Sequence, residues 1–323
     1  MNTDKTISVA MATYNGERYI QEQIDSILNQ TYLPTEIIIC DDCSTDNTWN
    51  ILEEYTNKYP IIKIFKNNKN LGFRLNFEKA IKLCKGNYIA LSDQDDIWLP
   101  NHLQTLINHI KEHSVACGDA ILMDANGMNL NLKLSKQEGL DAIPTNDIEN
   151  AYYIYYNRGV YQGASMLLNR DFLNIALPIP DGVQFHDVWF SFLACFINGL
   201  KNIDECITLY RQHENNSSGT HLNSVNKISI FKWHLFSKGN LNYRHLLLKP
   251  IKERIQLDEK QLEFVNRAEV YCKNRFNTKG RINNAIFEIM NFKLIYGTKK
   301  SFHQYLFIYI IDKLKNKLKF LSH

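Results

Sequence analysis

Apolar segments and helical patterns alternate regularly over the first 125 residues of this chain. Four short, almost continuously apolar runs have the length and composition of buried strands: residues 7–12, 36–40, 61–65 and 88–91. The segments beside them carry apolar residues at helical spacing: residues 19–28, 49–55, 73–84 and 101–113. A fifth strand is expected at residues 121–123. Strands that are apolar on both sides need helices on both faces, so the pattern predicts an α/β fold with a doubly wound, mostly parallel sheet.

Polar residues follow three of these strands at the point where each strand ends. The first runs into Thr13-Tyr14-Asn15-Gly16, the second into Asp41-Asp42, and the fourth into Asp93-Gln94-Asp95-Asp96, here called the acidic loop. Parallel strands bring their carboxyl ends to one edge of a sheet, where α/β proteins bind ligands. The three carboxylates of the acidic loop repel one another, so the loop is either a hydrated turn or a site for a hard cation such as Mg²⁺ or Mn²⁺. Convergence of three polar loops favours a nucleotide pocket.

Length, charge and cysteine content bound the class of protein. At 323 residues the chain is long enough for one large domain and an appendage, and a net charge of +3 gives no support for a nucleic-acid partner. The seven cysteines are odd in number and scattered, which favours a reducing cytoplasm over a disulfide framework. Neither a signal peptide nor a membrane-spanning apolar run is visible, so we expect a cytoplasmic protein.

The segment after the fifth expected strand is less regular. Residues 126–158 are rich in Asn and are interpreted as loops around a site, and further strands are expected at residues 162–168 and 203–210. Between those strands His186-Asp187 opens an apolar helix, and Arg211-Gln212-His213 follows the last strand. An Asp directly before a helix is a good N-cap, so a purely structural role for Asp187 stays open.

From about residue 223 the composition changes to basic, aromatic and aliphatic residues at helical spacing. We therefore expect one main domain at residues 1–222 and a helical C-terminal extension at residues 223–323. Its last stretch, residues 302–320, combines apolar side chains with four lysines. Such a basic amphipathic helix can lie on an anionic membrane surface, as in a peripheral membrane protein. The alternative is that it packs on the protein itself or on a second subunit of an oligomer.

Several segments, in the order in which they occur, carry a family resemblance. They are residues 7–16, 24–31, 39–46 and 86–96, followed by His186-Asp187-Val188-Trp189 and Arg211-Gln212-His213. This ordered set resembles the inverting family 2 glycosyltransferases of the bacterial polysaccharide and O-antigen type, and the acidic loop is similar to a DxDD form of their DxD motif. The resemblance covers about residues 5–220 and implies a GT-A fold with its catalytic domain at residues 1–222.

The resemblance also implies roles for individual residues. It assigns eight to the nucleotide-sugar: Thr13, Tyr14, Asn15, Asp42, Arg74, Asp93, Asp96 and Arg211. It assigns three to a Mn²⁺ or Mg²⁺ ion: Asp95, His213 and Asp93. It makes Asp187 the catalytic base and places His186 and Trp189 on the acceptor side, with the protein core as the alternative place for Trp189. A carboxylate at Asp42 that accepts the N3–H of a base favours uridine or thymidine over cytidine, whereas Asp41 is expected to cap the next turn.

A reaction follows from these roles. Negative charge grows on the leaving nucleoside diphosphate, and a divalent ion with Arg211 would neutralise it. Asp187, on the opposite face, would take the proton of the attacking hydroxyl, which implies one displacement with inversion. The expected function is transfer of a hexose from a UDP-sugar, with dTDP-rhamnose as the alternative donor, to a saccharide hydroxyl of a lipid-linked surface polysaccharide intermediate.

Two other classes of protein fit parts of the sequence. A nucleotidyltransferase also combines a doubly wound sheet with an acidic metal site, but it would carry a Gly-rich, basic loop where this chain has Thr13-Tyr14-Asn15-Gly16. A non-catalytic sugar-binding protein would not need Asp95, Asp187 and His213 together. Both alternatives therefore account for fewer of the motifs than a glycosyltransferase does.

Overall fold

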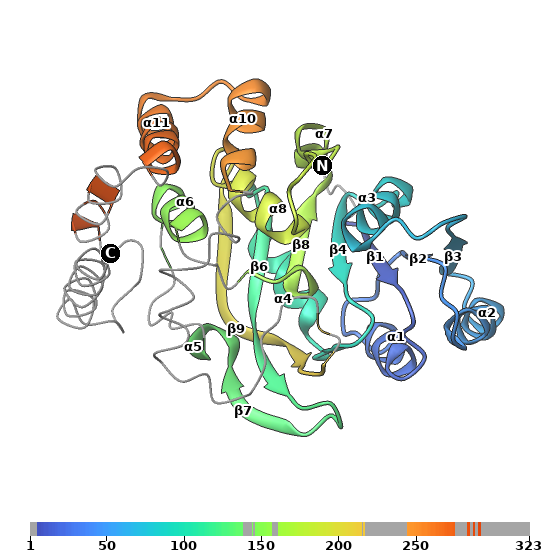
Figure 1. Ribbon diagram of the computed structural model, residues 1–323. Coiled ribbons are helices and arrows are strands. Elements are labelled where there is room, and N and C mark those ends of the chain that lie inside the picture. The colour runs from blue at the N-terminus through green and yellow to red at the C-terminus, as the bar shows by residue number, and fades with distance from the viewer. Residues whose placement is uncertain are drawn as a thin grey trace, which may run out of the picture.

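The computed structural model describes residues 5–137, 144, 146–156, 161–214, 216, 244–274, 283, 284, 287, 290 and 291. At its centre is a nine-stranded sheet with the strand order β3-β2-β1-β4-β8-β6-β9-β5, and β7 pairs with β6 (Figure 1). The strands are β1 (Ile7–Thr13), β2 (Glu36–Asp41), β3 (Ile62–Lys66), β4 (Tyr88–Ser92), β5 (Ile97–Trp98), β6 (Val115–Met123), β7 (Asn129–Lys133), β8 (Met166–Asn169) and β9 (Leu200–Arg211).

The sheet is mostly parallel. Strands β1 to β4 pair with one another in parallel, and β9 runs parallel to β6. Strand β8 lies antiparallel between β4 and β6, while β5 and β7 are antiparallel to their neighbours. Among the described strands, β1, β2, β3, β4, β6 and β9 therefore share one direction, which confirms the predicted α/β fold.

Helices cover both faces of the sheet (Figure 1). They are α1 (Ile20–Leu28), α2 (Thr48–Lys58), α3 (Phe73–Leu83), α4 (His102–Ile110), α5 (Leu134–Gln137), α6 (Asp147–Tyr156), α7 (Arg170–Ala176), α8 (His186–Ala194), α10 (His245–Arg254) and α11 (Glu259–Asn274), with a 3₁₀ turn, η1, at Gly163–Ser165. Successive side chains of a strand point to opposite faces. Thus Ile37 and Ile39 pack with α1, α2 and α4, while Ile38 and Cys40 pack with α3, α6 and α8. This arrangement explains why the strands are apolar throughout.

The interpretation of residues 126–158 as loops is wrong in part. Strand β7 pairs with β6 across a turn in which the carboxylate of Asp124 accepts the N–H of Met128. Helix α6 carries four tyrosines that are all buried: Tyr152, Tyr153, Tyr155 and Tyr156. A helix that is buried around most of its surface lacks the one-sided apolar pattern by which an amphipathic helix is detected.

The expected domain boundary at residue 222 and the basic stretch at residues 302–320 both lie outside the described residues. Helices α10 and α11 confirm the helical character of the C-terminal extension. Leu247 and Ile251 of α10 and Phe264 of α11 are buried in the same hydrophobic cluster as α6 and α8. This part of the extension therefore completes the core on one face of the sheet. Within the described part of the chain, every helix is too short or too polar to cross a membrane.

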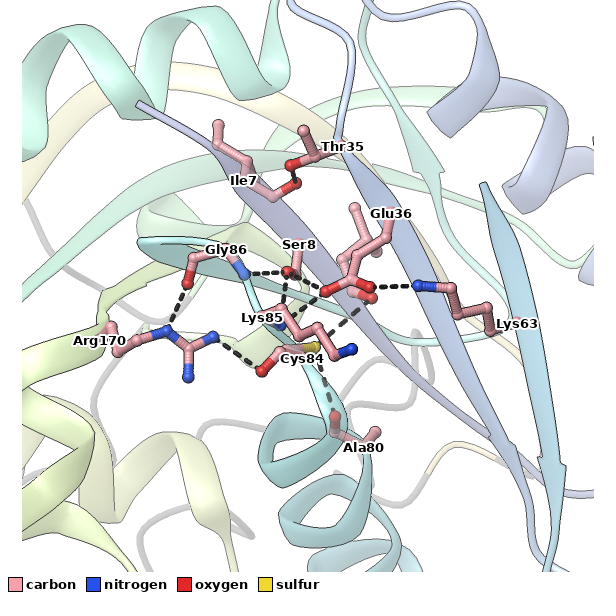
Figure 2. Close-up of polar contacts among 11 residues, drawn as sticks. Ile7, Ser8, Thr35, Glu36, Lys63, Ala80, Cys84, Lys85, Gly86 and Arg170 are labelled. Carbon is pink, nitrogen blue, oxygen red and sulfur yellow. Dashed lines mark hydrogen bonds and ion pairs between the residues drawn. The ribbon is translucent and has the colours of Figure 1, made fainter. Parts of the chain in front are cut away.

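A polar network holds together the ends of the strands opposite the polar loops (Figure 2). Glu36, at the start of β2, is its centre. Its Oε1 accepts hydrogen bonds from Ser8 Oγ at 2.8 Å and the Lys85 N–H at 2.6 Å, and its Oε2 faces Lys63 Nζ at 2.8 Å. Burial by itself would raise the pKa of Glu36, but the hydrogen bonds from Lys63, Ser8 and Lys85 outweigh it, so the pKa lies below its ordinary value of 4.5.

Glu36→Gln is expected to lower the free energy of unfolding at pH 7 by about 1–3 kcal/mol, because hydrogen bonds to a charged acceptor are lost. A carboxyl group with a lowered folded-state pKa stabilises the fold above its unfolded-state pKa, and that stabilisation disappears as the pH falls through the folded-state pKa. The difference between wild type and Glu36→Gln in urea denaturation should therefore shrink below about pH 4. An equal difference at both pH values would show that the carboxylate charge is not responsible.

Candidate active site

The acidic loop and the loop after β1 are joined by the side chain of Gln94. Its Oε1 accepts the Tyr14 N–H at 2.9 Å, and its Nε2 donates to the Tyr14 carbonyl at 3.0 Å. Gly16 permits this approach, because a Cβ there would collide with the Gln94 amide. No role was predicted for Gln94 from the sequence. A residue that bonds to backbone far along the chain leaves no periodic signal in the sequence.

The loop after β1 is also tied to the loop after β2. The Asn15 N–H donates to Ser44 Oγ at 2.9 Å, and the Asn15 side chain accepts the Thr45 N–H at 2.8 Å. Thr13 Oγ1 donates to the Asp41 carboxylate at 3.2 Å, and the same carboxylate accepts the Ser44 N–H. The predicted capping role of Asp41 is therefore confirmed, and the three loops that follow β1, β2 and β4 form one connected edge.

Asp42 shapes the loop between β3 and α3. Its Oδ1 accepts the Leu71 N–H at 2.8 Å and Asn67 Nδ2 at 2.7 Å, and its Oδ2 accepts the Gly72 N–H at 2.8 Å. Its side chain is buried. The sequence did not reveal that Asp42 holds the loop between β3 and α3. Contact of Asp42 with a nucleotide base stays a prediction.

Arg74 reaches the segment that precedes α8. Its Nη1 donates to the Ile179 carbonyl at 3.0 Å, and its Nη2 lies 3.7 Å from the Asp181 carboxylate. In the structure the Arg74 guanidinium therefore joins α3 to the segment that leads to Asp187. A contact between Arg74 and a diphosphate stays a prediction.

The acidic loop concentrates negative charge at the carboxyl end of β4. Burial, with the Asp95 and Asp187 carboxylates adding to it, raises the pKa of Asp93 to about 8. Burial and the neighbouring Asp95 and Asp93 carboxylates hold the pKa of Asp96 well above its usual range. Asp96 Oδ1 accepts the Arg211 N–H at 2.9 Å, whereas its buried Oδ2 has no hydrogen-bond partner among the described residues. Such a cluster attracts a cation.

Arg211 and His213 bring the end of β9 to the acidic loop. Arg211 Nε donates to the Asp95 carbonyl at 2.7 Å, and His213 Nε2 lies 2.8 Å from Asp95 Oδ2. Asn216 closes the turn, since its Oδ1 accepts the His213 N–H and its Nδ2 donates to the Arg211 carbonyl. The ring of Tyr19 stacks on His213 at 5.1 Å and lies 4.5 Å from the Arg211 guanidinium. Tyr19 is a site residue that the motif analysis missed.

Asp187 lies in the first turn of α8. The helix begins at His186, so Asp187 is not the N-cap. Its Oδ1 accepts the Val188 N–H at 2.7 Å. Burial raises the pKa of Asp187 to about 6, although hydrogen bonds from the N–H groups of Val188 and Gly163 oppose the rise. Because the Asp187 charge also raises the pKa of Asp93, the two carboxylates belong to one electrostatic site.

His186 and Trp189, both predicted on the acceptor side, are buried side chains of α8. Trp189 is 0% exposed and its indole N–H donates to the Ala176 carbonyl at 2.8 Å, so its prediction as an acceptor-binding residue is wrong. His186 is largely buried against Phe77, 4.1 Å between ring centroids, and burial lowers its pKa to about 3. A neutral His186 contacting an acceptor stays a prediction.

The donor atoms at the acidic loop fit a metal ion that also binds phosphate. Within the described residues, no group of three or more His, Cys, Asp or Glu side chains is arranged to hold an ion alone. Asp95 Oδ2 and His213 Nε2, however, are 2.8 Å apart, close to the ~3 Å between adjacent ligands of an ion with ~2.1 Å bonds. Mg²⁺ is commonly bound by only one or two carboxylates and completes its shell with phosphate and water.

Comparison with known proteins places this chain in a family. Residues 8–175, just over half of the 323-residue chain, match the sequence model of glycosyl transferase family 2. The chain is 36% identical over 222 residues to the dTDP-rhamnosyl transferase RfbG of Shigella flexneri, covering 66% of this chain and 74% of that protein. It is 38% identical over 109 residues to the UDP-Glc:alpha-D-GlcNAc-diphosphoundecaprenol beta-1,3-glucosyltransferase WfaP of Escherichia coli, covering 34% and 43% respectively.

A solved structure shares the fold. The crystal structure of S. aureus TarS 1–349 superposes with a TM-score of 0.56 at 19% identity, covering 80% of this chain and 69% of that one. Its complex with UDP gives a TM-score of 0.52 at 20% identity, covering 81% and 71%. These likenesses show the GT-A type of fold. The chain belongs to glycosyl transferase family 2. It is a glycosyltransferase, and the nucleotidyltransferase and non-catalytic alternatives are set aside.

Proposed function

We propose that this enzyme transfers a hexose from a nucleotide-diphosphate sugar to a saccharide hydroxyl, with inversion at the anomeric carbon and with a divalent metal ion. The observation that carries the proposal is the family match together with the contacts of Arg211 and His213 with Asp95 in the acidic loop. Asp187, in the first turn of α8, is the proposed base, and burial raises its pKa to about 6. A base with a pKa of about 6 is largely ionised near neutral pH, yet is close enough to that pH to accept a proton efficiently.

Each group in the site has a part in this reaction. The Asp187 carboxylate accepts the proton of the acceptor hydroxyl as its oxygen attacks the anomeric carbon. Asp95 and His213 would hold the metal ion, which when bound supplies positive charge toward the departing diphosphate. Gln94 ties the acidic loop to the Tyr14 backbone, and Arg211 bonds the Asp95 carbonyl, so the loop need not reorganise during the reaction. A single base opposite the leaving group supports a single displacement.

We propose a UDP-hexose as donor and dTDP-rhamnose as the alternative. The names of WfaP and of the TarS complex support uridine, while the name of RfbG supports dTDP-rhamnose. Both nucleosides carry the N3–H that a carboxylate can accept. A saccharide on a lipid diphosphate is the proposed acceptor, supported by the name of WfaP. The basic stretch at residues 302–320 would hold the enzyme at an anionic membrane surface.

The donor proposal is tested by thermal unfolding with Mn²⁺ and a panel of UDP-glucose, UDP-GlcNAc, dTDP-rhamnose and CDP-glucose. A ligand at one hundred times its Kd adds about 2.7 kcal/mol of stability. We expect one uridine or thymidine sugar to raise Tm by roughly 5 °C, and CDP-glucose to have little effect. Release of nucleoside diphosphate with a glycolipid acceptor then tests transfer. Equal stabilisation by CDP-glucose would contradict the pyrimidine selectivity, and no stabilisation by any sugar nucleotide would contradict the donor class.

A further inference from the structure

The guanidinium of Arg211 is a buried charge at the centre of the site. The side chain is 1% exposed. Its Nε contacts the Asp95 carbonyl, its backbone N–H contacts the Asp96 carboxylate, and its planar group lies over the ring of Tyr19. A buried charge is stable only when it is paired and hydrogen-bonded. The guanidinium of Arg211 therefore needs a charged partner, and its Nε contact joins that pair to the acidic loop at Asp95.

Glu22, in the first turn of α1, is that partner. Its Oε2 lies 2.5 Å from Arg211 Nη2, and within the described part of the chain it is the one carboxylate within 4.0 Å of the guanidinium. The Glu22 side chain is 54% exposed, so it can be replaced without opening a cavity in the core. Arg211 thus links three elements: α1 through Glu22, the acidic loop through Asp95 and Asp96, and β9 through its own backbone.

We propose that Glu22 is a positioning residue of the transferase site, which acts through Arg211 to hold the acidic loop in the geometry that binds metal and diphosphate. The predicted effect of Glu22 on donor binding rests on the proposed function, whereas its effect on the order of the acidic loop does not. Residues that orient metal-binding groups through hydrogen bonds typically contribute 10- to 100-fold to affinity or activity.

A competing arrangement makes the opposite prediction. Suppose that Glu22 only forms an ion pair with Arg211 until a diphosphate replaces the Glu22 carboxylate. Removing the Glu22 charge would then free the guanidinium and tighten donor binding. If Glu22 positions the loop, the same change weakens donor binding. The direction of the change in affinity therefore separates the two roles.

The test compares Glu22→Gln with Asp25→Asn. Both remove one carboxylate charge from an exposed position of α1, but the Asp25 carboxylate faces the Tyr55 hydroxyl instead of the site. Hydrogen exchange of the backbone amides in residues 93–98 measures loop order without any ligand. Titration calorimetry with UDP and Mn²⁺ measures binding without turnover. We expect Glu22→Gln to speed exchange in residues 93–98 and to weaken UDP binding roughly 10-fold or more, with Asp25→Asn like wild type.

Arg211→Gln shows whether Glu22 acts through Arg211. In a double-mutant cycle, adding Glu22→Gln to Arg211→Gln should change the exchange of residues 93–98 little further. Fully additive effects, unchanged exchange in a folded Glu22→Gln protein, or tighter UDP binding would overturn the proposal. If wild type binds neither UDP nor dTDP, the proposed donor is wrong, and the exchange measurements still decide the role of Glu22.

Discussion

Asp187→Asn should lower kcat by roughly 10²-fold or more while leaving the fold intact. A general base contributes about 10²- to 10⁴-fold to rate, and an amide cannot take the hydroxyl proton. The Asn carboxamide oxygen can still accept the Val188 N–H that the Asp187 carboxylate accepts in the structure. The melting temperature should therefore stay near that of wild type, and steady-state kinetics with calorimetry would separate the two effects.

The pH profile gives this prediction a second readout. Because burial raises the pKa of Asp187 to about 6, the base becomes protonated below that pH. The kcat of wild type should fall as the pH decreases through about 6, and the residual activity of Asp187→Asn should lack that step. An Asp187→Asn protein with wild-type kcat would show that the residue is structural.

Removal of the metal ion should have an effect of similar size. A chelator should abolish transfer, and Mn²⁺ or Mg²⁺ should restore it. Asp95→Ala should reproduce the chelator, with a loss of at least roughly 10²-fold in kcat, because it removes charge stabilisation of the leaving group. Stability should change little, since the Asp95 charge raises the pKa of Asp93 and Asp96 and its removal relieves that repulsion.

Asp204→Ala is a suitable control for Asp95→Ala. The Asp204 side chain is 81% exposed and pairs with Lys133 on the surface, so its loss should leave kcat unchanged. Full activity in excess chelator would contradict the metal requirement. Activity that is lost in chelator but kept in Asp95→Ala would place the ion on other ligands of the site.

The first half of the fold was predictable because its signals are local. Strands β1 to β4 begin and end within one residue of the expected ranges, since each is a short apolar run between helical patterns. The acidic loop was also predictable as a loop after a strand, because a cluster of carboxylates at that point is unusual in itself. The second half of the fold was harder to predict from the sequence. Helix α6 is buried on most sides, and β8 inserts between β4 and β6 although it follows both in sequence.

The sequence by itself determined the α/β class, the edge of the sheet at which the site lies, and the carboxylates that form it, because periodicity and charge are properties of neighbouring residues. Only the tertiary structure decided which groups meet. It paired Glu22 with Arg211, 189 positions apart, and Gln94 with Tyr14, 80 positions apart. It also buried Trp189 fully in the core, although Asp187, two residues earlier in the same helix, is only partly buried. Such choices depend on how separate elements pack, and packing across long sequence separations leaves no local pattern to read.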